Sequence, residues 1–270
     1  MDKTGRPGVS EPRSGTQAVE RAFDVLRAIA AHGDEGARLS DLVEQLGLSK
    51  PTVRRLVAAL VGLNIAAQDP RTRRYNLGLE LFSLGALAGR RLDLRLTAAG
   101  ALATLADETQ DTVFLSIPDG ANSVCIARYE GQFPIKALTM SVGDRRPLGI
   151  GAGSLAMLSC LPDDEISAVL AANADRYQPF APEVSPAILM RRIAETRQHG
   201  FASSAFFFDS GIAIPGMNAI GVPILTAYGI VLGAVSVAAV PERLQPPRRD
   251  KVVALAKVAA GDIAATATKK

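Results

Sequence analysis

Hydrophobic positions recur at helical spacing in three consecutive stretches near the start of the chain. Residues 19–31 place apolar side chains every three or four positions and predict an amphipathic helix. A second, shorter helix is predicted over residues 41–46, with Ser40 as its N-cap. A third helix is predicted directly after the tight turn 47–49, and Ser49 is placed to cap it.

Two short helices joined by a tight turn, the second starting with polar and basic residues, are typical of a helix-turn-helix. The third helix turns an apolar stripe inward, formed by Val53, Leu56, Val57 and Leu60. A helix that enters the major groove must offer hydrogen-bond donors from its N-terminal half. The side chains predicted to contact DNA there are Ser49, Lys50, Thr52, Arg54 and Arg55.

A hairpin with a basic tip is predicted after the third helix. Residues 64–68 and 74–77 have strand character, and residues 69–73 form a polar turn between them. A basic hairpin behind a recognition helix is typical of a wing that meets phosphates or the minor groove. The predicted contacts are Arg71, Arg73 and Arg74. The alternative is a winged-helix module used for protein contact.

Residues 78–92 are too apolar for a plain linker. They predict a connecting helix that also pairs with another subunit, because one recognition helix covers few base pairs and two half-sites multiply specificity. The expected assembly from this pattern is a homodimer. Burial of these side chains within one chain is the alternative.

From residue 93 to residue 270 the pattern predicts an α+β domain, with an antiparallel sheet and helices on its faces. The predicted strands are 112–117, 123–129, 135–141, 219–225 and 231–240. The predicted helices are 95–108, 155–161, 163–171, 186–199 and 247–266. Residues 221–240 are almost membrane-span length without a charge, but Pro223 and a Tyr228-Gly229 turn favour two strands over a membrane helix.

Length, composition and charge agree with this division. A chain of 270 residues favours two domains, and 48% hydrophobic residues exclude general disorder. Residues 1–14 are polar and predict a disordered tail without a targeting signal, and residues 15–77 form the predicted winged helix. The net charge of +3 divides into +4 over residues 1–91 and −1 over residues 92–270. This asymmetry suggests a polyanionic partner for the first third alone, and a solvated basic face is the alternative.

Little in the sequence supports catalysis. The chain has two cysteines and two histidines, so we expect a reducing cytosol, no metal site, no cofactor and no enzyme activity. The loop Gly149–Ser154 stands before a helix and offers free N–H groups, which can bind a carboxylate. Its candidate contacts are Gly151, Ala152, Gly153 and Ser154. The alternative is close packing of a helix on the sheet.

Several motifs together resemble the isocitrate lyase regulator (IclR) family of bacterial transcription factors. They are Ala18–Phe23, Leu46–Leu56, Arg74–Gly78, Val142–Leu148, Gly200–Ala202 and Gly221–Ile224. The resemblance implies a homodimer or tetramer. In it, a winged helix binds double-stranded operator DNA and a C-terminal GAF-like domain binds a small effector, often an organic or aromatic acid. It places Ala152 and Gly153 on effector-loop positions, Ser236 on a last-strand serine position and Asp209 near an acidic position. Ala238 stands where relatives can carry a second serine.

Two other functions remain open from the sequence. One is an enzyme that acts on a small acid and uses the N-terminal domain for assembly. The other is a DNA-binding protein that responds to no ligand.

Overall fold

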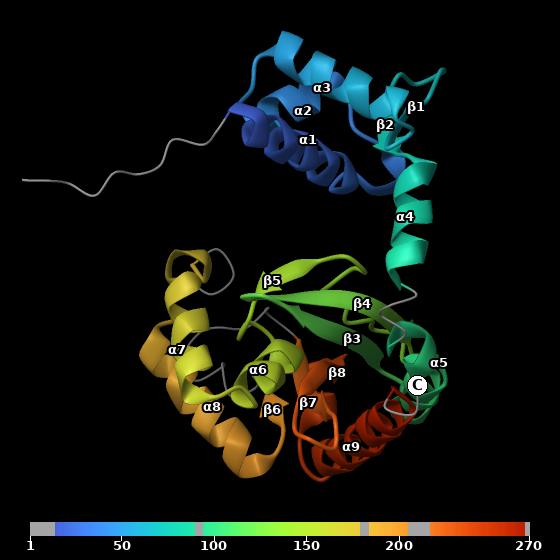
Figure 1. The fold of residues 1–270 in the computed structure, drawn as a ribbon. Coiled ribbons are helices and arrows are strands. Elements are labelled where there is room, and N and C mark those ends of the chain that lie inside the picture. The colour runs from blue at the N-terminus through green and yellow to red at the C-terminus, as the bar shows by residue number, and fades with distance from the viewer. Residues whose placement is uncertain (1–13, 90–93, 179–183, 205–216, 268–270) are drawn as a thin grey trace, which may run out of the picture. The chain divides into compact units, whose positions relative to one another are not determined.

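The computed structural model describes residues 14–89, 94–178, 184–204 and 217–267 (Figure 1). The chain divides into two compact units, residues 1–92 and 93–270. The predicted tail lies outside the described residues except for Ser14, which begins the first helix. No helix in the described ranges is long and apolar enough to cross a membrane.

The N-terminal unit is a helix-turn-helix with a wing, as the sequence predicts. Its elements are α1 (Ser14–Ala30), the 3₁₀ turn η1 (Gly33–Glu35), α2 (Leu39–Leu46), α3 (Lys50–Gly62), β1 (Ala66–Gln68), β2 (Tyr75–Leu77) and α4 (Leu79–Gly89). The core gathers one apolar stripe from each of the first three helices, including the fully buried Ile29, Leu42 and Val53. The antiparallel strands pair Ala66 with Leu77.

The start of α2 differs from the prediction. Arg38, not Ser40, occupies the N-cap position, and its backbone N–H donates to the Asp41 carboxylate at 3.0 Å. This hydrogen bond lowers the pKa of Asp41. Ser40 Oγ lies 3.1 Å from the same carboxylate. An acidic side chain in the first turn therefore begins this helix, where the sequence suggested a hydroxyl.

The C-terminal unit is the predicted α+β fold. Its strands are β3 (Thr112–Asp119), β4 (Asn122–Glu130), β5 (Arg145–Pro147), β6 (Ala202–Ser203), β7 (Asn218–Leu225) and β8 (Val231–Ala239). They form an antiparallel sheet in the order β5-β4-β3-β8-β7-β6. Its helices are α5 (Leu94–Thr109), α6 (Ala152–Ser159), α7 (Asp163–Ala172), α8 (Pro186–His199) and α9 (Arg248–Ala267), with 3₁₀ turns at Ala174–Arg176 (η2) and Pro241–Leu244 (η4).

Alternation along the strands gives the sheet two different cores. Val235 and Val237 face α5 and α9, while Ala234 faces the layer of α6, α7 and α8 (Figure 1). Residues of one strand can pack against two helix layers because successive side chains point to opposite faces. The fold therefore has three layers, with the sheet in the middle.

The predicted strand over residues 135–141 is wrong. This connection between β4 and β5 has no regular secondary structure, and β5 (Arg145–Pro147) pairs with β4 in its place. Two of its carbonyl groups accept from arginine side chains, Thr139 from Arg146 and Met140 from Arg128. Side-chain donors thus satisfy backbone groups that a strand would pair. The sequence also missed β6, which has two residues.

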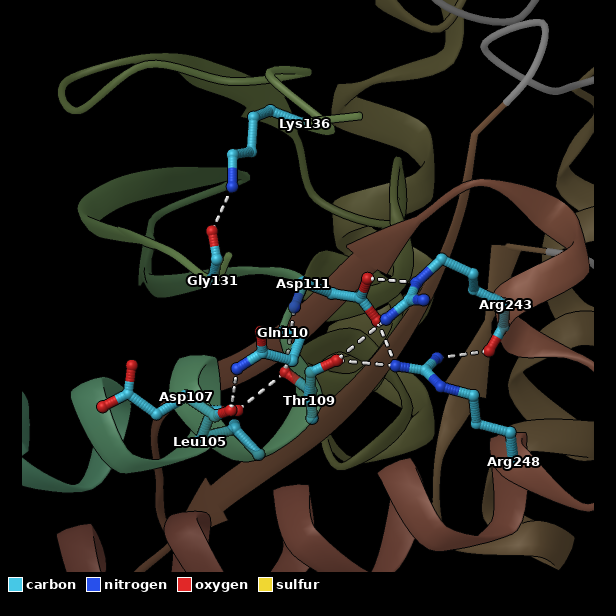
Figure 2. A network of polar contacts seen from close by, with 9 residues as sticks. All are labelled: Leu105, Asp107, Thr109, Gln110, Asp111, Gly131, Lys136, Arg243 and Arg248. Carbon is cyan, nitrogen blue, oxygen red and sulfur yellow. Dashed lines mark hydrogen bonds and ion pairs between the residues drawn. The ribbon is translucent and has the colours of Figure 1, made fainter. Parts of the chain in front are cut away.

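A buried carboxylate ties the two ends of this unit's sequence together. The Asp111 side chain is 1% exposed and accepts from Arg243 Nε and Arg248 Nη2, each at 2.7 Å (Figure 2). Both arginines also donate to the carbonyl of Thr109, and the Arg243 guanidinium lies 3.8 Å from the ring centre of Phe133. Asp111 therefore fastens the end of α5 to η4 and the start of α9.

Replacing Asp111 by Asn should destabilise the C-terminal unit by about 3–5 kcal/mol, because two guanidinium groups would lose the carboxylate that compensates their burial. Urea unfolding followed by far-ultraviolet circular dichroism measures the change. The matched control is Asp119→Asn, which removes an exposed carboxylate paired with Arg145 and should cost less than about 1 kcal/mol. Equal effects of the two variants would contradict the assigned role of Asp111.

Candidate DNA interface and effector site

The start of α3 presents a cluster of cations to solvent. Lys50, Arg54 and Arg55 are exposed in its first two turns. Ser49 occupies the N-cap position as predicted, but its hydroxyl lies 2.8 Å from Thr52 Oγ1 and makes no hydrogen bond to a helix N–H. The two hydroxyls therefore hold each other at the helix N-terminus, beside the basic side chains.

The tip of the wing is shaped by Asp69. Its Oδ1 accepts the backbone N–H groups of Arg71 at 2.7 Å and Thr72 at 3.0 Å. These bonds lower the pKa of Asp69, the bond from Thr72 contributing most. Arg73 has a left-handed backbone with φ of +60°. The turn leaves the side chains of Arg71 and Arg73 exposed.

Arg74 differs from its neighbours because it points back into the unit. Its Nη1 donates to the carbonyl of Gly36 at 2.8 Å, and its side chain is 26% exposed. Gly36 itself has a φ of +69° and packs so closely that a Cβ there would lie 2.6 Å from Asn76 Oδ1. Arg74 thus clamps the turn before α2 onto the base of the wing.

The structure adds a residue that the sequence analysis missed. A groove of about 660 Å³ runs between α2, the start of α3 and the wing, and four basic residues are among those that line it. They are Arg38, Lys50, Arg54 and Arg73. Only Arg38 was not predicted, since it lies in a loop outside both basic clusters. Asp41, three positions later, was the available signal that the helix begins there.

In the C-terminal unit, the glycine-rich loop folds back on itself. Ser154 Oγ accepts the N–H of Gly149 at 2.8 Å and lies 3.5 Å from the carbonyl of Pro147. Gly149 and Gly151 adopt positive φ values of 107° and 88°, which side-chain-bearing residues rarely adopt. The Ser154 hydroxyl therefore braces the loop from inside, and α6 begins at Ala152, earlier than predicted.

Close backbone packing fixes the position of α6 over the sheet. A Cβ on Gly221 of β7 would lie 2.2 Å from the carbonyl oxygen of Ala152, and one on Gly153 would lie 3.3 Å from Ser236 Oγ. All eight residues of α6 are buried. The loop positions and Ser236, predicted to share a site, are thus brought together, by the kind of packing that the sequence analysis kept as the alternative.

An apolar cluster lies on the same face of the sheet, beside this contact. It comprises Phe114, Cys125, Ala137 and Ala238, with Met140, Met217 and Ala219 packed against it. Ser236 pairs with Phe114 across β8 and β3 and therefore shares their face. Burial raises the pKa of Cys125 to about 11, so its thiol stays protonated at neutral pH. Asp209, the predicted acidic contact, lies outside the described residues.

Other candidate chemistry is sparse in the described part of the chain. It contains no group of three or more His, Cys, Asp or Glu side chains that could hold a metal ion. Both cysteines are free thiols. His199 ends α8 as predicted, and its Nδ1 lies 2.7 Å from the carbonyl of Glu195.

Comparisons with known proteins agree with this two-unit architecture. A family model for the IclR helix-turn-helix domain matches residues 18–70, and one for the bacterial transcriptional regulator IclR C-terminal domain matches residues 87–265. The regulator XynR of Escherichia coli is 29% identical over 84% of this chain and 88% of its own. The repressor AllR of Klebsiella pneumoniae is 27% identical over 91% of this chain and 89% of its own.

Solved structures show the same fold. An IclR transcriptional regulator from Alicyclobacillus acidocaldarius matches with a TM-score of 0.75 and 25% identity, over 93% of this chain and 98% of that one. An IclR homologue from Microbacterium hydrocarbonoxydans, solved in complex with 4-hydroxybenzoate, matches with a TM-score of 0.75 and 19% identity, over 94% of this chain and 100% of that one.

The contact between α6 and β7 can be tested by adding one methyl group. Gly221→Ala should destabilise the C-terminal unit by about 1–3 kcal/mol or more, because the new Cβ would overlap the Ala152 carbonyl and force the backbones apart. Gly261→Ala in the exposed part of α9, where a Cβ meets nothing within 4 Å, should instead stabilise by about 0.5–1 kcal/mol. Thermal unfolding of the full chain distinguishes them, and a neutral Gly221→Ala would refute the close contact.

Proposed function

The chain belongs to the IclR family of bacterial transcriptional regulators, and on that basis we propose that its N-terminal unit binds operator DNA under the control of a small effector held in the C-terminal unit. The observation that carries the DNA-binding part is the basic groove between α3 and the wing. The cytoplasm, where the DNA lies, is the proposed location.

In the proposed complex, the exposed side chains of α3 enter the major groove. Lys50, Arg54 and Arg55 reach base edges or phosphates, and the Ser49–Thr52 hydroxyl pair lies at the helix N-terminus where a phosphate is favoured. Arg71 and Arg73 bind flanking phosphates, and Arg38 extends the same track from the start of α2. Arg74 contributes through the wing that it clamps.

The effector site is proposed where the start of α6 meets Ser236 and the apolar cluster. This arrangement combines the N–H groups of a helix start with a cluster of apolar side chains, which suits a small organic acid. The M. hydrocarbonoxydans homologue is solved with an aromatic acid. An effector alters DNA binding only as far as its affinity differs between two arrangements of the protein.

The two alternative functions are an enzyme that acts on a small acid and a DNA-binding protein that responds to no ligand. An enzyme needs a nucleophile or acid–base pair, whereas in the described residues Ser154 is occupied by the loop backbone and Cys125 is a buried, protonated thiol. A DNA-binding protein that responds to no ligand would bind no small carboxylate specifically. Thermal melting of the protein with a panel of small carboxylates tests this, because a ligand of the native state raises Tm by mass action.

A homodimer or tetramer is proposed to bring two recognition helices to one operator. The supporting observation is that α4 keeps large apolar side chains in solvent, with Leu79 at 76% and Phe82 at 74% exposed. Exposure of this kind is typical of an interaction surface. A second copy of the same unit would cover it.

Neutralising the recognition helix should weaken operator binding and relax its specificity. Arg54→Ala and Arg55→Ala should each cost about 1–3 kcal/mol where the side chain reads a base. Arg71→Ala and Arg73→Ala should instead lower affinity for all duplexes and flatten the salt dependence, by about 0.9 in the logarithmic slope per lost phosphate contact. Electrophoretic mobility shifts at several salt concentrations separate the two effects. They compare a promoter fragment that the wild-type protein binds with a random duplex.

The matched control for the DNA-binding test is Arg27→Ala. Arg27 is exposed on α1, is paired with Asp24 and is absent from the groove lining, so its loss should leave affinity and salt slope unchanged. An unaltered footprint and salt dependence after neutralising Arg54, Arg55, Arg71 and Arg73 together would reject the proposed interface.

The proposed assembly predicts that Phe82→Glu shifts the protein toward monomer at micromolar concentration. The variant would place a charge where the proposed interface buries an aromatic side chain. Analytical ultracentrifugation measures the distribution. The matched control is Tyr228→Ser, which changes a side chain in the C-terminal unit that is 89% exposed. It should leave the distribution of monomer and oligomer unchanged. A monomeric wild-type protein, or an unaffected Phe82→Glu variant, would contradict the role of α4.

A further inference from the structure

We propose that Arg146, which the sequence analysis did not single out, binds the carboxylate of the effector. This inference rests on the effector-responsive function proposed above and names the chemistry of that same site. It makes the effector an anion with an apolar body, selected by a residue at the edge of the sheet.

The sheet register places Arg146 on the face of the sheet that carries the apolar cluster. Arg146 pairs with Ser123 of β4 and therefore lies on the same face as Ser123 and Cys125. Cys125 belongs to the apolar cluster. On its other side, Arg146 Nη1 is the atom nearest to where a Cβ on Gly151 would be, at 4.0 Å. The guanidinium thus lies between the apolar cluster and the residue that precedes α6.

The charge of Arg146 is only weakly compensated. Within the described residues it forms no salt bridge, and its hydrogen bond goes to the neutral carbonyl of Thr139. Burial lowers the pKa of Arg146, while the nearby Asp144 opposes that shift. The Asp144 carboxylate is engaged elsewhere, accepting the N–H of Ser141 at 2.7 Å. A half-buried guanidinium facing a neutral acceptor gains strongly from a carboxylate, with which it can form paired, charge-assisted hydrogen bonds.

The two nearest arginines show the contrast. Arg145 pairs with Val124, so it points to the opposite face and contacts the Asp119 carboxylate. Arg128 lies on the same face as the apolar cluster, but its Nη2 is 3.1 Å from Glu130 Oε1. Both therefore have carboxylate partners already. Among these three side chains, Arg146 is the one left to recognise an anion from solution.

A second positive feature lies beside Arg146. The first turn of α6 contains no acidic residue, and no side chain caps it at Gly151. The N–H groups at such a helix start carry partial positive charge and bind anions. Arg146 Nη1 lies beside Gly151, the N-cap residue of α6, so a carboxylate bound between them would receive donors from both.

The apolar cluster on this face fits the apolar body of such a molecule. Phe114 pairs with Ser236 across β3 and β8, and Phe114 and Ala238 lie on the same face of the sheet. The fitting class is a small acid with an aromatic or aliphatic body.

The test compares acids with their neutral amides on the full-length protein. The probes are 4-hydroxybenzoate, benzoate and pyruvate, each beside its amide, in thermal-shift and calorimetric titrations. At least one acid should raise the Tm of the wild type, and its amide should bind at least tenfold more weakly. Absence of a shift with every acid, or equal binding of acid and amide, overturns the proposal.

The variants then assign the effect to Arg146. Arg146→Gln should weaken binding of the active acid by about 10–100-fold, the loss expected for a hydrogen bond to a charged group. Arg146→Lys keeps the charge without the paired geometry and should fall in between, which also guards against a variant that fails to fold. Arg145→Gln, on the opposite face, should bind the acid like the wild type. Wild-type binding by Arg146→Gln overturns the assignment.

Mobility shifts with the promoter fragment keep this test separate from the proposed function. Arg146→Gln without any acid should retain wild-type DNA affinity, because Arg146 lies in the C-terminal unit. Loss of acid binding with intact DNA binding supports the role of Arg146. If the wild type binds the acid through Arg146 but no promoter DNA, the effector assignment stands and the regulatory function fails.

Discussion

The backbone contact between Ala152 and Gly221 sets the geometry on which the C-terminal site depends. At this point the start of α6 and strand β7 approach so closely that no Cβ fits between them. The approach brings Gly153 against Ser236 and leaves the first turn of α6 at the edge of the apolar cluster. A longer separation would admit side chains and water between helix and sheet. The glycines therefore act here by allowing two backbones to touch, and this contact places the helix start where the effector site is proposed.

The role of each arginine side chain depends on the direction in which the backbone places it. Two pairs of adjacent arginines show this. Arg73 is exposed at the wing tip, while Arg74 turns inward to the Gly36 carbonyl. Along β5, strand alternation directs Arg145 to Asp119 and places its neighbour Arg146 on the opposite face, which carries the apolar cluster. A count of basic residues does not distinguish these four arginines. The groups that they contact do.

Much of the fold could be predicted from the sequence because its signals are local. Helix α8 occupies residues 186–199 as predicted, since Ser185 caps its start and Gly200 ends it with a left-handed backbone. The prediction failed over residues 135–141, where alternating apolar residues indicate an extended chain but cannot say what satisfies its carbonyls. The donors come from Arg128 and Arg146, whose positions depend on the folded sheet.

The candidate site residues also differ in whether local sequence signals could predict them. The cations of α3 and the wing were predicted because helix and hairpin signals are local. Arg38 and Arg146 were missed because their importance arises from neighbours distant in the sequence. The fold class and family were confirmed, whereas the contacts to DNA and effector stay predictions.

The magnitudes show why the proposed effector site needs more than one contact. Inverting a two-state equilibrium from 1:99 to 99:1 requires about 5.5 kcal/mol of differential binding, whereas a hydrogen bond to a charged group supplies about 1.5–3 kcal/mol. A carboxylate contact at Arg146 would therefore be too weak to act as a complete switch by itself. Burial of an aromatic body of about 150–250 Å² against the cluster around Phe114 would add about 4–6 kcal/mol at 25 cal/mol per Å². Only the part of this energy that differs between two arrangements of the protein shifts their populations, so in the proposed site the apolar body supplies most of the binding energy and the carboxylate contact supplies the selectivity for acids.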